Sequence, residues 1–369
     1  MIMKAIFFVS EEIFSSSGIS KKVLAQCDGL RNNGIDVELC HIKRIGNKSF
    51  FVIGEFPICS LGKSDRIVHI KSRYKYKEIA DYIIQNHFDF IYIRYIHNGT
   101  PFFLRFLKTL KDNKVRILLE IPTWPYDLEF KYSSLGSRFL SFVEKWTRKR
   151  FVKYVDRIVT VQNFDTILNV PTIKISNAVE LSSVPLRKPV PHQRIIFLGV
   201  ANLGIWHGYD RLIEGIGLYY ENGGKKDIHF YIVGNIDSVL DDYMKVVNKY
   251  NISKRIHIEG PKAGIELDPY FDMADMAVGS LGGHRKGLTD AKPLKCVEYA
   301  ARGIPFFYSE YNSDFNNCEF CTQVSQDDSP IMVNDILSFF EGVKCRPEEI
   351  RAYVKDSLTW QVQMKKVMQ

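Results

Sequence analysis

Strand-like and helix-like stretches alternate along almost the whole chain, and this alternation restricts the fold more than any other feature of the sequence. The first stretch, "KAIFFVS", is continuously apolar, as a buried strand is. The next, "GISKKVLAQCDGLRNNG", repeats apolar residues at helical spacing and ends in Gly34. Similar pairs follow, and a second series begins at "RIIFLGV". Buried strands that alternate with helices predict parallel βαβ units and a doubly wound sheet.

The two series predict two domains, which the length of 369 residues also favours. A polar, proline-rich stretch, "VELSSVPLRKPVPHQ", separates them and places the boundary near residues 181–193. We therefore expect an α/β protein of two Rossmann-like domains that face each other across a cleft, with ligands at the carboxyl ends of the strands. The expected parts are an N-terminal domain over 1–188, a second domain over 189–355 and a terminal helix over 356–369.

Positive charge is concentrated in the first half of the chain. Residues 1–188 hold 30 Lys and Arg against 18 Asp and Glu, a net charge of +12, whereas the whole chain carries +8. This asymmetry predicts an anionic partner for the first half. The stretch 137–155, "SRFLSFVEKWTRKRFVKYV", mixes aromatic and basic residues as helices on anionic membranes do, although a solvated basic face fits the pattern as well. No nucleic-acid-binding motif is present, so we expect no nucleic acid partner.

Several other classes of protein lack support in the sequence. No apolar run approaches the roughly 18 residues that span a bilayer, and "MIMKAIFFVS" is typical of a first strand rather than of a signal peptide. Seven scattered cysteines favour a reducing compartment, hence the cytoplasm. Neither a P-loop nor a G-x-G-x-x-G after the first strand occurs, and no D-x-D motif stands out. We expect neither a cofactor nor a metal.

A glycine-rich loop before a short helix carries the clearest signal for a site. The strand-like "DMAVGSL" leads into "GGHRKGLTDA" and then into a helical pattern that ends at Gly303. Glycine N–H groups and a helix N-terminus both favour anions, so the loop predicts a diphosphate site, with a solvated surface turn as the alternative. The candidate contacts are Gly283, Arg285, Lys286, Leu294 and Lys295.

Two acidic residues belong to the same segment. Glu298 lies in the middle of the short helix, where a carboxylate needs a partner, and it could accept hydrogen bonds from a ribose diol beneath the anion site. Asp290 precedes the helix. Alternatively, the aspartate stabilises the helix dipole and the glutamate pairs with the lysine three residues earlier.

The segment "DAKPLKCVEYAARGIPFF" resembles the acidic-x7-acidic segment of the retaining glycosyltransferases of family 4, which have the GT-B fold. Asp290 stands where that family usually has its first glutamate, and Glu298 matches the second. The resemblance implies that Glu298 holds the ribose of a nucleotide-sugar donor. It also implies that Asp290 lies beside the transferred sugar, which makes it the first candidate for a catalytic residue.

Other segments extend the resemblance over most of the chain. The stretch "SSSGIS" resembles the family's N-terminal glycine loop, with Gly18 where two glycines are usual. That loop faces donor and acceptor in the family, so the resemblance implies that Gly18 contacts the donor. The stretch "FLGVANLGIWHGYDRLIEG" resembles the segment whose arginine and lysine grip the diphosphate; here Val200 replaces the arginine and His207 stands near the position of the lysine. Cations of the later loop would then supply the missing charge. "SLTWQVQMKKVMQ" resembles the terminal helix that crosses back onto the first domain, anchored by Trp360.

The stretch "EIPTWPYDLEF" is similar to one found in members that build bacterial surface polysaccharides. Its prolines bracket a loop at the end of a strand and would present Trp124, Tyr126 and Asp127 to an acceptor sugar, although the two aromatic residues could equally be core residues of a turn. Glu120, which precedes the loop, is a second and weaker catalytic candidate, as an acid or base.

These observations predict a hexosyltransferase that moves a sugar from a nucleotide-sugar donor to a saccharide acceptor, lipid-linked, in bacterial polysaccharide or capsule biosynthesis. The resemblance implies retention at the anomeric carbon, and helix and lysine charges would replace a metal. The enzyme would lie on the inner face of the cell membrane. Two alternatives stay open: a nucleotide-sugar epimerase of the same fold, and a non-catalytic protein that binds membranes or polysaccharide.

Overall fold

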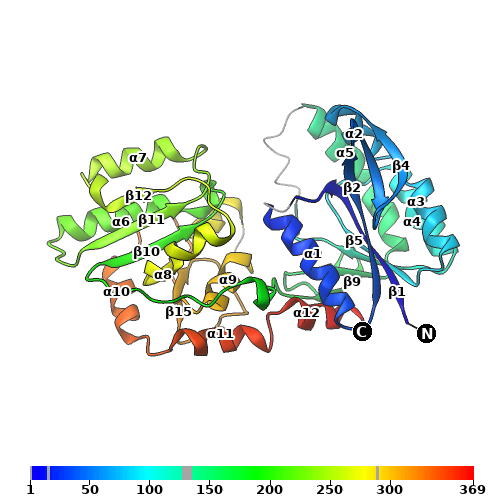
Figure 1. Cartoon of the computed structure of the whole chain (residues 1–369). Coiled ribbons are helices and arrows are strands. Elements are labelled where there is room, and N and C mark those ends of the chain that lie inside the picture. The colour runs from blue at the N-terminus through cyan, green and yellow to red at the C-terminus, as the bar shows by residue number, and fades with distance from the viewer. Residues whose placement is uncertain (1, 15–16, 127–134, 288–290) are drawn as a thin grey trace. The chain divides into compact units, whose positions relative to one another are not determined.

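The structure is a computed structural model that describes residues 2–14, 17–126, 135–287 and 291–369, with the backbone alone for 135–139. The chain forms two compact α/β units (Figure 1). The first comprises Met1–Ser176 together with Trp360–Gln369, and the second comprises Asn177–Thr359. The division therefore precedes the proline-rich stretch, and the last helix belongs to the first unit.

The sheet of the first unit is mixed. In space the strands follow the order β4-β3-β2-β1-β5-β6-β7-β9-β8. Neighbouring strands in the part β2-β1-β5-β6-β7 are parallel, with β1 and β5 at the centre. The strands are β1 (Lys4–Glu12), β2 (Asp36–Ile45), β3 (Lys48–Ile53), β4 (Phe56–Gly62), β5 (Phe90–Arg94), β6 (Arg116–Glu120), β7 (Arg157–Thr160), β8 (Thr166–Ile167) and β9 (Val170–Lys174). The helices are α1 (Gly18–Arg31), α2 (Asp65–Lys71), α3 (Lys77–Gln85), α4 (Pro101–Asp112), α5 (Leu135–Phe151) and α12 (Trp360–Val367).

The strands β3 and β4 are an addition that the alternation of strands and helices did not predict. They pair antiparallel with β2 and with each other. Gly46 and Gly54 stand in the two connecting turns with φ of 59° and 58°, values that glycine adopts without the steric cost of a Cβ atom. The result is an antiparallel extension at one edge of the sheet, and β8 pairs antiparallel with β9 at the other edge; such edges on a parallel centre are common in doubly wound folds.

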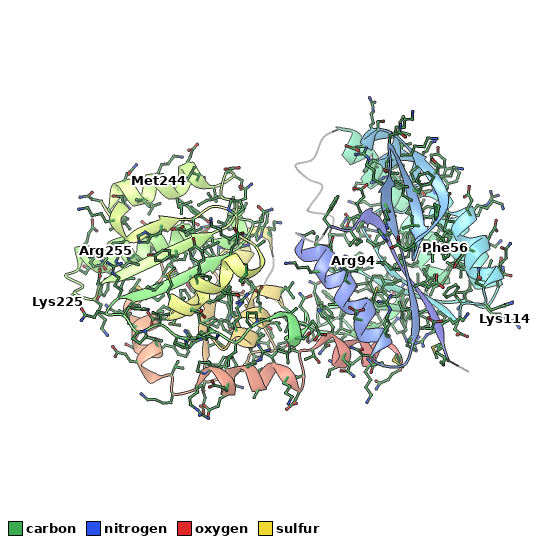
Figure 2. The ribbon with its side chains drawn as sticks, in the orientation of Figure 1. Phe56, Arg94, Lys114, Lys225, Met244 and Arg255 are labelled. Atoms are coloured by element: carbon green, nitrogen blue, oxygen red, sulfur yellow. The ribbon has the colours of Figure 1, made fainter. Side chains whose placement is uncertain are left out.

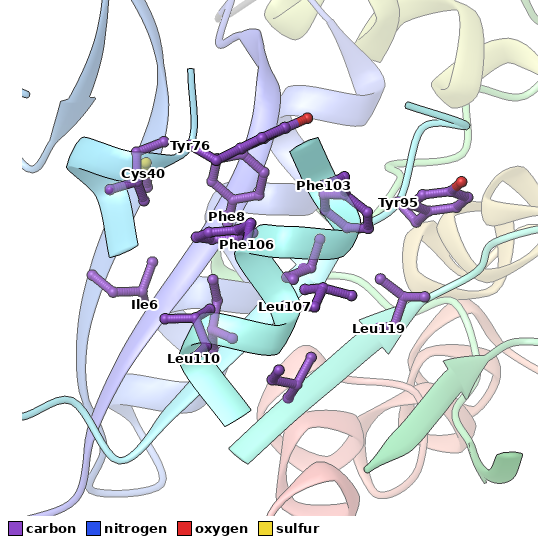
Figure 3. Packing of buried hydrophobic residues seen from close by; sticks show 14 of the residues in the cluster. Ile6, Phe8, Cys40, Tyr76, Tyr95, Phe103, Phe106, Leu107, Leu110 and Leu119 are labelled. Carbon is purple, nitrogen blue, oxygen red and sulfur yellow. The ribbon is translucent and has the colours of Figure 1, made fainter. Parts of the chain in front are cut away.

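The core of the first unit is rich in aromatic side chains. Phe8 of β1, Tyr76 and Phe106 of α4 are buried together, with the rings of Tyr76 and Phe106 stacked at 5.2 Å (Figure 3). Burying each such ring contributes roughly 2 kcal/mol. Helix α4 begins where Thr100 caps it, with Pro101 in the first turn, so its apolar face is fixed against the sheet.

Helix α12 packs against α1, as predicted for the terminal helix. A Cβ atom on Gly29 of α1 would lie 2.7 Å from the carbonyl oxygen of Trp360, so glycine is what allows the two helices to approach this closely. The side chain of Gln363 accepts a hydrogen bond of 2.7 Å from the backbone N–H of Ser176. Trp360 itself is buried.

The second unit has a fully parallel sheet in the order β12-β11-β10-β13-β14-β15. Its strands are β10 (Ile195–Val200), β11 (Ile228–Val233), β12 (Ile256–Ile258), β13 (Met276–Val278), β14 (Phe306–Tyr308) and β15 (Cys321–Gln323). Its helices are α6 (Tyr209–Glu221), α7 (Leu240–Lys249), α8 (Asp268–Met273), α9 (Leu294–Arg302), α10 (Val333–Gly342) and α11 (Pro347–Lys355). The predicted doubly wound fold is therefore confirmed in both units.

Candidate functional site

The second unit has a topological switch point between β10 and β13. From β10 the chain proceeds outward to β11 and β12, then returns to β13 on the other side of β10 and proceeds to β14. The connections therefore leave the sheet in opposite directions at the carboxyl ends of these two neighbouring strands. In doubly wound sheets this is the place where ligands bind.

The two loops that leave the switch point are held together by their backbones. Short 3₁₀ turns follow each strand, Ile205–His207 after β10 and Gly283–Lys286 after β13. The N–H of Leu281 donates to the carbonyl oxygen of His207 at 2.8 Å, within hydrogen-bonding distance. A Cβ atom on Gly208, whose φ is 61°, would lie 2.6 Å from the nitrogen of Gly282. Glycine at 208 is therefore required both for its conformation and for this contact.

Lys295 is the side chain best placed to bind an anion. It is the second residue of α9, whose N-terminus has no side-chain cap. Its ammonium nitrogen is buried and has no hydrogen-bond partner among the residues that the structure describes. Burial lowers the pKa of Lys295 to about 8. A buried donor without a partner is rare and costly, so this lysine, together with the dipole of the helix N-terminus, favours an anionic ligand.

His207 lies beside this lysine but carries no charge near neutral pH. Its ring is buried, and Nδ1 lies 3.0 Å from the backbone nitrogen and 3.3 Å from the carbonyl oxygen of Gly204. Burial, and then the charges of Lys295 and Lys286, lower the pKa of His207 to about 2. A neutral histidine cannot supply the positive charge that the missing arginine and lysine would bring.

Of the two cations in the glycine loop, Arg285 is already engaged. Its guanidinium donates twice to the carboxylate of Asp210, at 2.9 and 2.7 Å, and once to Asp328 at 2.6 Å. These bonds raise the pKa of Arg285 and brace the loop against α6. Lys286 is exposed, with its nitrogen 3.4 Å from the ring centre of Trp206. Lys286 therefore remains a candidate contact, while the contacts of Arg285 favour a bracing role.

Glu298 and Leu294 lie on α9 with Lys295. Leu294 opens the helix and is half-buried, and the side chain of Glu298 is 34% exposed. Glu298 accepts a bond of 3.3 Å from Nε of Arg302, which also donates to Asp268 at 2.8 Å. The glutamate thus keeps a carboxylate oxygen for a ligand while its partner holds it in place. Asp290 lies outside the described residues.

In the first unit, Glu120 is the centre of a buried charge cluster. Its carboxylate contacts the ammonium of Lys22 at 3.0 Å and the guanidinium of Arg94, labelled in Figure 2, at 2.8 Å. Tyr92 and Gln26 donate to its other oxygen. Burial alone would raise the pKa of Glu120, but the two cations and the hydrogen bonds lower it to about 2. A carboxylate this strongly held in the ionised form favours a structural role over that of acid or base.

Gly18 starts α1 directly after β1, at the switch point of the first sheet between β1 and β5. Ser17 caps the helix by accepting a hydrogen bond from the N–H of Ser20. A Cβ atom on Gly18 would meet no atom within 4 Å, so neither conformation nor packing in this structure requires glycine there.

The three candidate acceptor residues differ in their placement. Tyr126 is buried, its hydroxyl donates to Glu144 at 2.7 Å, and its ring contacts Trp124 edge-on. This burial favours a core role for Tyr126, the alternative that the sequence left open. Trp124 is only half-buried, with the guanidinium of Arg148 5.2 Å from its ring centre. Asp127 lies outside the described residues.

Sequence reasoning missed Glu310, which directly follows β14 and is buried against the glycine loop. It also missed the hydroxyls of Tyr209 and Tyr299, which both donate to the carbonyl oxygen of Val278 at the end of β13. The only signal for Glu310 was a lone acidic residue after an apolar strand. Among the described residues, no three His, Cys, Asp or Glu side chains are grouped so that they could hold a metal ion.

Comparison with solved structures identifies the architecture. No protein-family model matches the chain, and no curated protein matches it in sequence. A glycosyltransferase from Rickettsia africae superposes with a TM-score of 0.67 at 13% identity, covering 99% of this chain and 97% of that one. Sucrose-phosphate synthase from Thermosynechococcus elongatus gives 0.69 at 14%, with 99% and 97% covered. HepE from Anabaena in complex with UDP gives 0.64 at 11%, with 99% and 98% covered. The chain has the fold of the GT-B glycosyltransferases.

Proposed function

We propose that this chain is a glycosyltransferase that moves a hexosyl group from a nucleotide-sugar donor to a saccharide acceptor. The observation that carries the proposal is the buried ammonium of Lys295 at the N-terminus of α9, which has no hydrogen-bond partner in the described parts of the chain and lies at the switch point of the second sheet. Such a place suits the diphosphate of a nucleotide sugar. Similar folds are known in complex with UDP, as in HepE, and with ADP, as in starch synthase IV from Arabidopsis thaliana, and these support the proposal.

In the proposed reaction the second unit binds the donor. Lys295 and the N-terminus of α9 stabilise the negative charge that develops on the departing diphosphate, without the help of a metal ion. Glu298 accepts hydrogen bonds from the ribose, and Asp290 lies beside the transferred sugar. The first unit binds the acceptor, and Gly18 in the loop after β1 is proposed as a contact of the donor. We propose transfer with retention and assign no enzyme nucleophile.

A two-step experiment tests this function. The purified chain is first screened for thermal stabilisation by UDP-, ADP-, GDP- and dTDP-sugars; a shift with one base identifies the donor class. The stabilising donor, radiolabelled in its sugar, is then incubated with a bacterial membrane extract. Transfer of label to lipid supports a lipid-linked acceptor in surface-polysaccharide synthesis. Conversion of the sugar without an acceptor would instead favour an epimerase, and the absence of any stabilisation would contradict the proposal.

Helix α5 carries the features of a membrane contact. Phe142 and Trp146 are 68% and 52% exposed, and the exposed cations Lys145, Lys149 and Arg150 lie on the same face at helical spacing. The acidic residue of this segment, Glu144, points inward, where it accepts bonds from Tyr95 and Tyr126. No helix among the described residues is both long and apolar enough to cross a membrane. We propose that this face binds the anionic inner surface of the cell membrane, where a lipid-linked acceptor would be found.

Reversal of two charges on α5 tests the membrane contact. The double variant Lys149→Glu/Arg150→Glu should bind vesicles of anionic phospholipid at least tenfold more weakly, because each basic residue contributes about 1 kcal/mol of attraction at such a surface. Co-sedimentation with vesicles measures the effect. The matched control, Lys48→Glu/Lys114→Glu, makes the same charge change at exposed positions on other elements of the first unit. Equal losses in both variants would show that net charge, and not this helix, governs binding.

The role of Glu298 is tested by replacing it with alanine. Loss of a charged acceptor for the ribose should weaken nucleotide-sugar binding by about 10- to 100-fold, because hydrogen bonds to charged groups contribute roughly 1.5–3 kcal/mol. Calorimetric titration with the donor found in the screen measures this. The deoxy-ribose analogue that lacks the bonded hydroxyl should bind both proteins equally. Unchanged donor affinity in Glu298→Ala would remove the ribose role.

A further inference from the structure

The side chain of Glu310 lies directly beneath the glycine loop of the candidate site. It follows β14 and is 2% exposed. A Cβ atom on Gly283 would lie 2.2 Å from its Oε1, so the loop backbone rests on the carboxylate, and the backbone of Gly283 is also hydrogen-bonded to it. Its second oxygen, Oε2, has no hydrogen-bond partner among the residues described. A buried carboxylate with an unused oxygen needs an explanation.

Two cations and one thiol interact electrostatically with Glu310 from the helices packed against it. Lys295 on α9 is the stronger of the two cations. Arg211 on α6 has the weaker effect, and its guanidinium donates to the carbonyl oxygens of Leu281 and Ser329. The thiol of Cys296 is buried, and its pKa is raised to a value that keeps it neutral. Burial raises the pKa of Glu310 to about 7, against the effect of its hydrogen bonds and of Lys295.

Lys295 and Glu310 therefore form an incomplete pair. Each offsets part of the other's charge, yet neither Nζ of the lysine nor Oε2 of the glutamate has a hydrogen-bond partner within the described part of the chain. A full buried ion pair would satisfy both groups, and an apolar core would contain neither. An incoming anion could complete the coordination of the lysine and leave the carboxylate to take up a proton.

We propose that Glu310 is a positioning residue of the donor site that holds the glycine loop and balances the charge of Lys295 until a diphosphate replaces it. This inference rests on the proposed function. When a diphosphate binds to Lys295, its negative charge disfavours the ionised form of the nearby glutamate. Binding then favours protonation of Glu310, so the site takes up hydrogen ions together with the donor.

The direction of the pH dependence follows from this exchange. Below pH 7 Glu310 is mostly neutral in the free protein, and nothing repels the diphosphate. Above pH 7 Glu310 is mostly ionised. The carboxylate must then take up a proton or repel the diphosphate, so the affinity for the donor falls as pH rises. For a group that titrates near pH 7 the fall between pH 6.0 and 7.5 is at most about fourfold.

A nucleotide sugar is the right probe because its diphosphate, esterified at both ends, does not titrate in this range. His207 stays neutral throughout, and Lys295 loses its charge only toward pH 8.

The test compares the wild-type chain with Glu310→Gln, whose amide imitates the protonated acid. The dissociation constant of the stabilising nucleotide sugar is measured by calorimetry at pH 6.0 and 7.5. We expect the wild type to bind about three- to fourfold more weakly at pH 7.5, and Glu310→Gln to change less and to bind more tightly than the wild type at pH 7.5. The control Glu341→Gln removes an exposed carboxylate of the same unit and should follow the wild type.

If Glu310→Gln binds the nucleotide sugar more weakly than the wild type, and by the same factor at both pH values, the role of Glu310 is purely structural and the inference is overturned. Should this variant fail to fold, the wild type alone gives the answer: titrations at pH 7.0 in two buffers of different ionisation enthalpy should show net proton uptake on binding, and an absence of uptake would contradict the proposal. Binding without pH dependence would refute the role of Glu310 only. No binding of any nucleotide sugar by the wild type would instead refute the proposed function.

Discussion

Glu120→Gln should lower the free energy of unfolding of the chain by about 3–5 kcal/mol, the largest stability effect that we expect from one conservative substitution. The glutamine keeps the shape of the side chain but leaves the charges of Lys22 and Arg94 buried without a counter-ion. The cluster already has two cations for one carboxylate. Burial, and then the charge of Arg94, explain why the pKa of Lys22 is lowered even though Glu120 lies 3.0 Å away.

Urea unfolding, followed by fluorescence and circular dichroism, measures this loss. The matched control is Glu55→Gln in the same unit, because Glu55 pairs with Lys43 at an exposed position and its removal should change the free energy by less than about 1 kcal/mol. Similar small effects in both variants would show that the buried cluster is not important for stability.

The same cluster predicts how stability changes in acid. The pKa of Glu120 is about 2 in the folded chain and roughly 4.3 in an unfolded one. A carboxyl whose folded pKa is depressed contributes its stability above the unfolded value. That contribution is therefore complete at neutral pH and disappears as pH falls from about 4 toward 2. Glu120→Gln should lack this part of the acid dependence.

Lys295→Met should weaken donor binding strongly while leaving the fold intact. The substitution removes a buried ammonium that has no hydrogen-bond partner among the described residues, so stability should stay equal or rise. Loss of a charged donor to the diphosphate should weaken nucleotide-sugar binding by about 10- to 100-fold. Calorimetry and thermal unfolding together measure both effects. The control Lys254→Met removes an exposed lysine of the same unit and should change neither.

The opposite outcome is as informative. A large loss of stability in Lys295→Met with donor affinity unchanged would mean that the ammonium serves the fold, through its charge interaction with Glu310 or its contact with the Tyr209 ring at 5.6 Å. The anion site would then have to be sought at Lys286, the exposed cation of the same loop.

The sequence predicted the fold well because the fold rests on local patterns. Strands of continuous apolar residues and capped helices such as α9, which ends at Gly303 in the left-handed region, can be recognised without knowledge of distant contacts. The strands β3 and β4 were not predicted, because they follow β2 without a helix between them and the alternation of strands and helices therefore did not indicate them.

Site residues were harder to predict because their roles depend on partners far away in the sequence. The sequence does not distinguish Lys295 from Arg285 and Lys286, because all three are cations of one segment. In the structure, Asp210 and Asp328 neutralise the arginine. Of the three, only Lys295 has a buried nitrogen without a hydrogen-bond partner in the described structure. Likewise, the sequence is compatible with Tyr126 either stacking on a sugar or packing in the core. Its hydrogen bond to Glu144, which is distant in the sequence, favours the core. Glu310 could not be found at all, since only the fold brings it beneath Gly283.

The most direct test of the donor site is a crystal structure of the full chain with the nucleoside diphosphate that the screen selects. Our account predicts diphosphate oxygens at about 3 Å from Nζ of Lys295 and against the first turn of α9, with the ribose at Glu298. A nucleotide bound elsewhere, with the ammonium of Lys295 still buried and without a partner, would contradict the central claim that this lysine marks the donor site.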